Sequence, residues 1–331
     1  MSTEKGIWNG TAGMADLGTQ RKRASEDRFR IGSVSKVFSS VVLLQMEAEG
    51  KLDLDDTVEK HLPGVVRGNG NDGSRITIRQ LLNHTSGLFN YTDDEGFSRQ
   101  IHEDYPRHRF QSRKPAEMLA VGLSHPPVFE PGKAWHYSNT NYILAGMITE
   151  KVAGHRFADE VERRIVQPLQ LRGTSLPGTT TRMPDPHGRA YSKLYLDDPN
   201  AKTYDTTEQN PSWLWSAGEI ISTTGDLNRF YQALLGGKLL PGRQQKELLT
   251  TVPTGIPEAG DYGLGIHRVV LPCGLPVWYH DGDIHGSKTL ATSTEDGRHT
   301  AAFNINGDWA FNLKTLIESE YCGVTDTKAA D

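Results

Sequence analysis

The sequence of 331 residues predicts an α+β fold, in which an antiparallel sheet is flanked by helices and carries a helical subdomain. Three observations predict it: an apolar helix near the N-terminus, amphipathic helical patterns in the middle, and short strands joined by turns in the last third. We expect one unit, residues 1–331. Its sheet part is expected over 1–50 and 215–331 and its mostly helical part over 51–214.

The first helix is expected over residues 36–46, KVFSSVVLLQM, which are apolar on nearly every face. Such a segment is typical of a helix that is buried on all sides. Gly50 follows as a natural stop, because glycine accepts the left-handed conformation that commonly ends a helix. Ser33 and Lys36 stand at the start of this helix, and side chains three residues apart share one helix face.

Further elements follow from hydrophobic periodicity. Helices are expected over residues 77–83, 115–121, 142–152, 157–166 and 226–235. Strands are expected over 262–271, 275–280, 288–293 and 300–305, before a closing helix over 309–317. Consecutive strands with short turns imply an antiparallel sheet.

Composition excludes several function classes. The formal net charge of −5 argues against a nucleic-acid binder, which would be expected to show a basic face. The one dense basic run, Arg21-Lys22-Arg23, is flanked by acids and is expected in a solvated loop. No stretch approaches the roughly 18 apolar residues of a membrane span. No signal peptide precedes the chain as written, which indicates the cytoplasm. The two cysteines, Cys273 and Cys322, could be free thiols or a disulfide.

Three motifs occur in a fixed order: Ser33-Val34-Ser35-Lys36, Tyr137-Ser138-Asn139 and His280-Asp281-Gly282. A serine hydroxyl is a poor nucleophile until a neighbouring base accepts its proton, and a lysine whose pKa is lowered by burial can be that base. One S-x-x-K match is weak evidence, since Ser2 and Lys5 also form one. All three motifs together predict a serine enzyme that acylates Ser33.

With these motifs the chain resembles the class C β-lactamase and serine DD-peptidase family, and most of all the soluble secreted D-alanyl-D-alanine carboxypeptidases. The similarity runs from Asp27 through DRFRIGSVSKVF, RITIRQLLNHTSGL, PGKAWHYSNTNYILAGMITEKVAG, SWLWSAGEIISTTGDLNRF, YGLGI and CGLPVWYHDGDIHG. The resemblance implies the β-lactamase/DD-peptidase fold and a reaction without cofactor or metal. It also implies a Cys273–Cys322 disulfide, and hence a secreted protein whose start is trimmed.

The resemblance also assigns roles. Ser33 is implied as the nucleophile and Lys36 as its activating partner. Tyr137 is implied to pass protons to the leaving group, with support from His280, and Asn139 to bind the acyl amide of the substrate. The backbone N–H groups of Ser33 and Asp283 are implied as the oxyanion hole. The candidates for substrate binding are Trp213, His267, Arg268, Asp281 and Gly282, whereas a place in the core is expected for Trp135 and Trp215.

Two departures from the family pattern change the expected substrate. His267 stands where the DD-carboxypeptidases use an arginine to hold the terminal carboxylate, with Arg268 beside it. Asp281 and Asp283 replace hydroxyl residues of those enzymes, and a carboxylate substrate would meet about 1 to 4 kcal/mol of repulsion per pair at 4 Å. We therefore expect a neutral or cationic leaving group. Only 32 residues precede Ser33, so either the start is trimmed or the sheet has lost an edge element.

Several alternatives remain open from the sequence. The acyl donor is a small molecule or a peptide: a D-amino-acid peptide, an amide or an ester. In a transacylation an amine would accept the acyl group. A protein of another class would be a β-lactam sensor that is acylated without turnover. The G-x-G-x-x-G match at 68–73 is expected to be a loop, and the group of His280, Asp281, Asp283 and His285 lacks the spacing of a metal site.

Overall fold

The computed structural model describes residues 1–331 except 197, 199, 310–311 and 324–331. Within these described residues, the largest sheet has eight strands in the order β11-β12-β13-β14-β15-β16-β1-β2, and each neighbouring pair is antiparallel. The strands are β11 Val252–Pro253, β12 Asp261–Tyr262, β13 His267–Val270, β14 Pro276–Ile284, β15 Ser287–Thr294, β16 Thr300–Ile305, β1 Ser2–Thr3 and β2 Gly6–Ile7. The predicted antiparallel sheet is confirmed.

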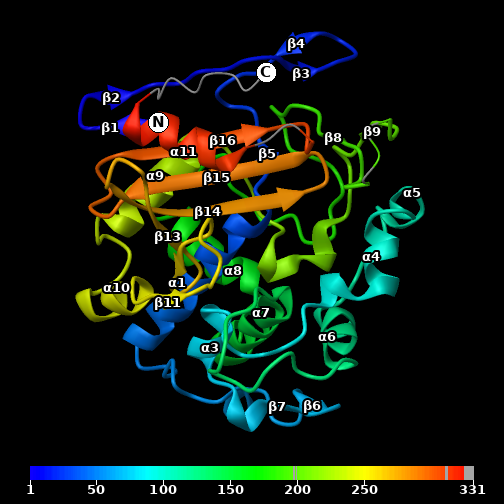
Figure 1. Cartoon of the computed structure of the whole chain (residues 1–331), viewed down its shortest axis with the longest axis vertical. Helices are drawn as coiled ribbons and strands as arrows, with labels where there is room; N and C mark the ends of the chain where they lie inside the picture. Colours follow the sequence, from blue (N-terminus) through cyan, green and yellow to red (C-terminus); the bar gives the residue numbers. More distant parts are fainter. Residues whose placement is uncertain (197, 199, 310–311, 324–331) are drawn as a thin grey trace.

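The central strands bury both faces of the sheet, because successive side chains of a strand point to opposite sides. Val277 and Leu290 pack with α11 (Leu313–Cys322), whereas their neighbours Trp278 and Ala291 join the main core. Helix α9 (Thr224–Leu235) packs against β15 and β16 on that second side. Figure 1 shows α11 over one face of the sheet and the helical part beyond the other.

The closing helix begins later than its apolar pattern predicts. It was expected from Trp309, but α11 starts at Leu313, after Asn312 accepts a hydrogen bond from the N–H of Thr315 at 3.2 Å. Such a cap ends the preceding extended chain and starts the helix. Trp309 is half exposed, and residues 310–311 of the expected helix lie outside the described residues.

Helix α1 (Ser35–Ala48) is the predicted central helix. Its apolar side chains are buried on all sides, and Gly50 beyond its end has φ +71°. Ser33 lies just before this helix, in a 3₁₀ turn formed by Gly32–Val34. Lys36 lies in the first turn of α1.

The helical part matches the predicted segments closely. Thr77 caps α3 in a capping box with Gln80, as the sequence pattern favours. The other α-helices of the described residues are α2 Val58–His61, α3 Ile78–Leu82, α4 Glu95–Ile101, α5 Tyr105–His108, α6 Pro115–Leu123, α7 Asn139–Ala153, α8 Phe157–Val161 and α10 Gly242–Leu248. The expected helix over 157–166 ends as a π-helical turn from Glu162 to Val166. No helix within the described ranges is long and apolar enough to cross a membrane.

Two expected strands differ from the structure. The strand expected over 262–271 is interrupted because Gly265 lies against α1: a Cβ there would stand 2.3 Å from the Ser40 hydroxyl. The strand expected over 275–280 instead continues to Ile284, so β14 carries the whole third motif. At the other edge of the sheet, β1 and β2 lie beyond β16. The sheet therefore has edge strands from the N-terminal segment, whereas the loss of an edge element was one of the two expectations.

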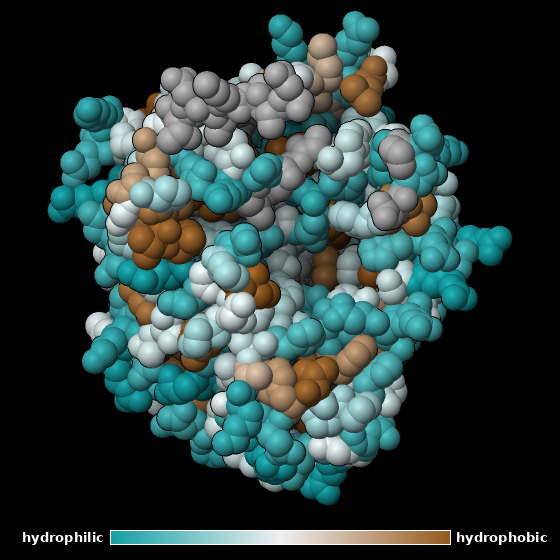
Figure 2. Space-filling view, viewed as in Figure 1, coloured by the Kyte–Doolittle hydropathy of each residue, from teal (hydrophilic) through white to brown (hydrophobic). Residues whose placement is uncertain are grey.

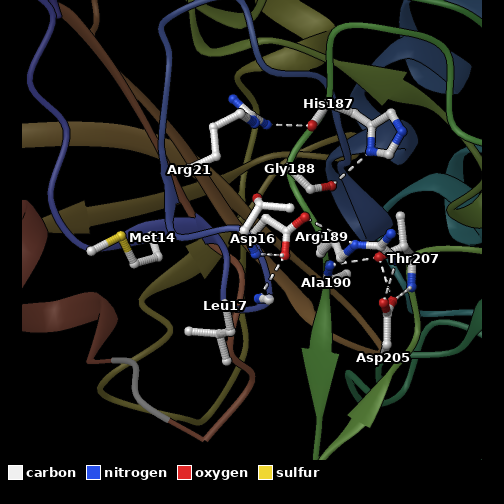
Figure 3. Close-up of polar contacts among 12 residues, drawn as sticks. Met14, Asp16, Leu17, Arg21, His187, Gly188, Arg189, Ala190, Asp205 and Thr207 are labelled. Carbon is white, nitrogen blue, oxygen red and sulfur yellow. Dashed lines mark hydrogen bonds and ion pairs between the residues drawn. The ribbon is translucent and has the colours of Figure 1, made fainter.

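The segment before Ser33 is fixed by a polar cluster (Figure 3). In the hairpin of β3 (Met14–Asp16) and β4 (Arg21–Lys22), Asp16 Oδ1 accepts the N–H of Gly18 at 2.8 Å. Arg189 donates from Nε to Asp16 Oδ2 at 3.3 Å and from Nη1 to Asp205 Oδ2 at 2.6 Å, and so joins the two carboxylates. The basic run at 21–23 is therefore partly a strand and not only a loop. Likewise, the glycine-rich segment at 68–73 forms part of a short hairpin of β6 (Arg67–Gly68) and β7 (Asn71–Asp72).

Candidate active site

The three motifs meet where β14 lies against the turn that carries Ser33, and where Lys36 and His280 lie close to Tyr137. Figure 2 shows a recess in this face of the molecule. Two glycines allow β14 to touch the turn that carries Ser33. A Cβ on Gly282 would stand 1.9 Å from the carbonyl oxygen of Ile31, and one on Gly32, where φ is +51°, would stand 2.6 Å from the nitrogen of Asp283. Only glycine fits at such close approaches. The backbone segments that carry the N–H groups of Ser33 and Asp283 thus lie beside each other.

Ser33 and Lys36 are in contact, as their spacing predicts. Lys36 Nζ lies 2.9 Å from Ser33 Oγ, 2.7 Å from Asn139 Oδ1 and 2.8 Å from the carbonyl oxygen of Ala217. The lysine is fully buried, and this burial lowers its pKa well below the usual value, against the opposing effect of the Asp281 charge. A neutral amine would donate its two hydrogens to Asn139 and Ala217, which leaves its lone pair for the Ser33 hydroxyl proton.

Tyr137 completes the group around Ser33. Its hydroxyl interacts with the side chain of Ser33, and its ring centre lies 4.8 Å from Lys36 Nζ. Burial raises the pKa of this phenol well above its usual value, so it holds its proton at neutral pH. Tyr137 stands in the loop before α7, and Asn139 is the first residue of that helix.

His280 contacts Tyr137 less directly than the family resemblance implies. The ring centres of His280 and Tyr137 are 6.4 Å apart. The imidazole instead shares a hydrogen bond of 3.0 Å with the hydroxyl of Tyr262, and its Nδ1 lies 2.5 Å from the carbonyl oxygen of Asp281. Burial lowers the pKa of His280 well below its usual value, so the ring is neutral. Tyr262 is a residue that the sequence analysis missed, although it opens the YGLGI segment.

The two acidic residues of the third motif have different surroundings. The carboxylate of Asp283 accepts the hydroxyl of Tyr195 and lies 3.1 Å from Lys288 Nζ, so its charge is compensated. Asp281 is partly exposed, and Nδ1 of the neutral His280 ring lies 4.0 Å from its carboxylate. Within the described ranges, no lysine or arginine forms an ion pair with Asp281. Of these two acidic residues, only Asp281 therefore brings an uncompensated negative charge to the site.

The residues at the expected carboxylate-binding position hold no positive charge there. His267 is buried, and its Nδ1–H donates to the carbonyl oxygen of Ala259 at 3.0 Å. Burial lowers the pKa of His267, which makes the ring neutral at pH 7. The guanidinium of Arg268 stacks on Trp278 at 6.0 Å. Neither side chain takes the place of the arginine of the DD-carboxypeptidases.

Three tryptophans divide between the site and the core. Trp135 was expected in the core, but its ring lies 6.5 Å from Tyr137 and 5.8 Å from Tyr262, so it borders the site. Trp215 packs on Phe157 in the core, as expected. Trp213 also packs against the core, with its ring 6.3 Å from His285.

A second acidic residue beside the site was not foreseen. Asn90 Oδ1 accepts the N–H of Asn139 at 2.9 Å, and Asn90 Nδ2 donates to Asp93 Oδ1 at 2.9 Å. The other oxygen of Asp93 lies 3.9 Å from His136 Nε2. Burial raises the pKa of Asp93. No lysine or arginine of the described residues pairs with it, so Asp93 is a second open carboxylate, on the Asn139 side. The sequence offered no signal beyond its position after the HTSGL segment.

Cys273 and Cys322 are joined in the structure by an S–S contact of 1.96 Å, with their Cα atoms 5.8 Å apart. The disulfide ties the turn after β13 to the end of α11. It lies on the α11 side of the sheet, among the residues that pack with Val277 and Leu290. It therefore braces the sheet and leaves the cleft free.

The Beta-lactamase family model matches residues 2–308. A D-stereospecific amidohydrolase from Streptomyces sp. is 49% identical, with a TM-score of 0.89 over 92% of this chain and 89% of that one. A D-amino acid amidase from Ochrobactrum anthropi SV3 is 27% identical, with a TM-score of 0.79 over 93% and 85% of the two chains.

Penicillin-binding protein 4* of Bacillus subtilis is 26% identical over 91% of this chain and 65% of its own length. The chain spans between 50% and 65% of the length of these curated relatives. It covers 50% of protein flp of Staphylococcus aureus. The family model covers nearly the whole chain, and the relatives with solved structures match both its parts. The fold, the relatives and the Ser33–Lys36 contact agree with a serine hydrolase, and the chain belongs to the beta-lactamase family.

Proposed function

We propose that this protein is a serine hydrolase that cleaves amides of D-amino acids through an acyl-enzyme on Ser33, with residues 1–331 acting as one catalytic unit. One observation carries the choice of substrate. The site holds the Ser33–Lys36 pair beside an uncompensated Asp281 carboxylate, and the position for a substrate carboxylate holds the neutral His267. Such a site favours a leaving group without a carboxylate.

The proposed reaction has two balanced steps. Lys36 accepts the hydroxyl proton of Ser33 as Oγ bonds to the substrate carbonyl carbon. The C–N bond then breaks, and the proton passes through Tyr137 to the leaving nitrogen, which departs as ammonia or an amine. Water next adds to the ester carbonyl, the C–Oγ bond breaks, and Ser33 regains its proton. Backbone N–H groups of Ser33 and Asp283 would stabilise the oxyanion, an interaction commonly worth about 10²–10³ in rate.

Asp93 supports the amino-acid character of the acyl group. It lies on the side of Asn139, which is the proposed partner of the acyl part of the substrate. A free α-ammonium group is cationic at neutral pH and would bind a carboxylate that lacks a cationic partner. The D configuration is proposed because two similar proteins are described as a D-stereospecific amidohydrolase and a D-amino acid amidase.

The experiment compares three substrates with wild-type protein and Ser33→Ala. We expect ammonia release from D-phenylalanine amide, at least tenfold slower release from the L amide, and slower cleavage of N-acetyl-D-alanyl-D-alanine. Ser33→Ala should abolish all turnover. Intact-protein mass spectrometry should find the acyl group on Ser33. Preferred cleavage of the free-acid peptide would overturn the proposal in favour of a DD-carboxypeptidase.

An amine acceptor is the second candidate outcome of the same acyl-enzyme. The specific observation in its favour is again Asp281, since a carboxylate attracts an ammonium group that approaches the leaving-group side. If transfer dominates, added alkylamine should give the D-phenylalanyl alkylamide faster than water gives free D-phenylalanine. The product ratio, measured by chromatography, decides between hydrolysis and transfer.

A further inference from the structure

His84 is a buried histidine that none of the three motifs includes. It follows α3 in the HTSGL segment, has no exposed surface, and adopts φ +63°, a left-handed conformation that few non-glycine residues take. Its ring lies among aromatic rings of the site, with its centre 4.3 Å from that of Tyr137 and 5.0 Å from that of Tyr262. A histidine held in this conformation at this place calls for an explanation beyond packing.

His84 accepts hydrogen bonds from the two residues that precede and follow Tyr137 in the chain. The carbonyl oxygen of His84 accepts the N–H of His136 at 3.0 Å. Its Nδ1 accepts the N–H of Ser138 at 3.1 Å. These donors are the residues immediately before and after Tyr137. One residue thus fixes the backbone on either side of the proposed proton carrier.

These contacts also fix the protonation state of the ring. Since Nδ1 accepts from Ser138, and Asn141 Nδ2 lies 3.2 Å from the same atom, the proton of the neutral imidazole stands on Nε2. Nε2 is buried and has no hydrogen-bond partner among the described residues. The histidine thus leaves one polar atom unpaired in the interior, a cost that a residue kept only for packing would avoid.

We infer that His84 is the positioning residue of Tyr137: it holds the phenol where it can pass a proton between Ser33 and the leaving group. The inference rests on the proposed function. A displacement of about 1 Å in a reacting group can cost about 10²-fold in rate. That loss should fall on leaving groups that need a proton and spare those that do not.

The test pairs two variants that differ in the acceptor. His84→Asn tolerates the left-handed backbone, and its Oδ1 can accept the Ser138 N–H, whereas His84→Gly tolerates the backbone and offers no acceptor. Both lose the ring. The substrates are D-phenylalanine p-nitroanilide, whose leaving amine must be protonated, and D-phenylalanine thiobenzyl ester, whose thiolate leaves without a proton. The value compared is kcat/KM, because it reports acylation and excludes hydrolysis of the acyl-enzyme.

We expect His84→Gly to lower kcat/KM for the anilide by about 100-fold and for the thioester by less than about fivefold. His84→Asn should stay within about fivefold of wild type on both substrates. On a Tyr137→Phe background, His84→Gly should cost less than about threefold, because the two residues act as one unit. Thioester turnover also shows that each variant is folded.

Three results would each overturn the role of His84. They are equal losses on both substrates, equal losses in the Asn and Gly variants, and a full further loss on the Tyr137→Phe background. Those results would leave the proposed amidase function standing. Wild-type protein that cleaves neither substrate would instead overturn the proposed function, and the role of His84 with it.

Discussion

Replacement of Asp281 by asparagine tests the electrostatic basis of the proposed substrate preference. The change keeps the shape of the side chain and removes its charge. Two unit charges at 4 Å repel by about 1 kcal/mol in water and about 4 kcal/mol at the effective dielectric of a protein surface. Since about 1.4 kcal/mol is a factor of ten, loss of this repulsion should raise the relative kcat/KM for a carboxylate substrate by about fivefold to several hundredfold.

The assay uses two substrates that differ only at the end that departs. They are N-acetyl-D-alanyl-D-alanine and the same peptide with a C-terminal amide. The value measured is the ratio of kcat/KM for the free acid to that for the amide. Asp281→Asn should raise this ratio at least about fivefold.

Asp283→Asn is the matched control. Its carboxylate is already compensated by Lys288 at 3.1 Å and bound by the hydroxyl of Tyr195, so its removal should change the ratio by less than about twofold. If Asp281→Asn leaves the ratio unchanged, or if Asp283→Asn changes it as much, charge at Asp281 does not set the preference. Wild-type protein that already favours the free acid would refute the same reasoning.

Three further predictions concern the lysine, the disulfide and a buried acid. Lys36→Arg should be inactive in kcat/KM assays from pH 6 to 9, because a guanidinium cannot give up its proton to become a base. Any activity of this variant would reject Lys36 as the base. Thiol titration of denatured, unreduced protein should find no free thiol, and Cys273→Ser/Cys322→Ser should lower the free energy of unfolding by about 4 kcal/mol for a loop of 49 residues. Burial raises the pKa of Glu219 to about 7, so the native state binds this proton more tightly than the unfolded chain, and the contribution of Glu219 to stability should fall as pH rises from 5 to 8. The stability of the wild type relative to Glu219→Gln, measured by urea unfolding, should therefore fall by about 2.5 kcal/mol over this range, and identical pH profiles would contradict it.

The elements with strong local signals could be predicted from the sequence alone. The apolar run at 36–46 has no polar face, so it could be stable only as a buried helix, and α1 is that helix. The strand at 300–305 appears with its predicted bounds. Ser33 and Lys36 are three residues apart at the start of one helix, so their contact depends on local geometry and was predictable.

Other features depend on residues that are distant in the sequence. The early end of the strand at Tyr262 follows from the approach of Gly265 to α1, more than 200 residues away, and no local pattern encodes it. The different surroundings of Asp281 and Asp283 depend on Lys288 and Tyr195, which pair with Asp283 alone.

The sequence by itself determined the contact between Ser33 and Lys36, the order of the motifs and the type of sheet, because each follows from spacing or periodicity along the chain. The tertiary structure decided which charges remain uncompensated, that His280 contacts Tyr262, and that His84 holds both neighbours of Tyr137. Burial and ion pairing depend on which surfaces meet when the helical part closes on the sheet, and these contacts join residues from distant parts of the chain.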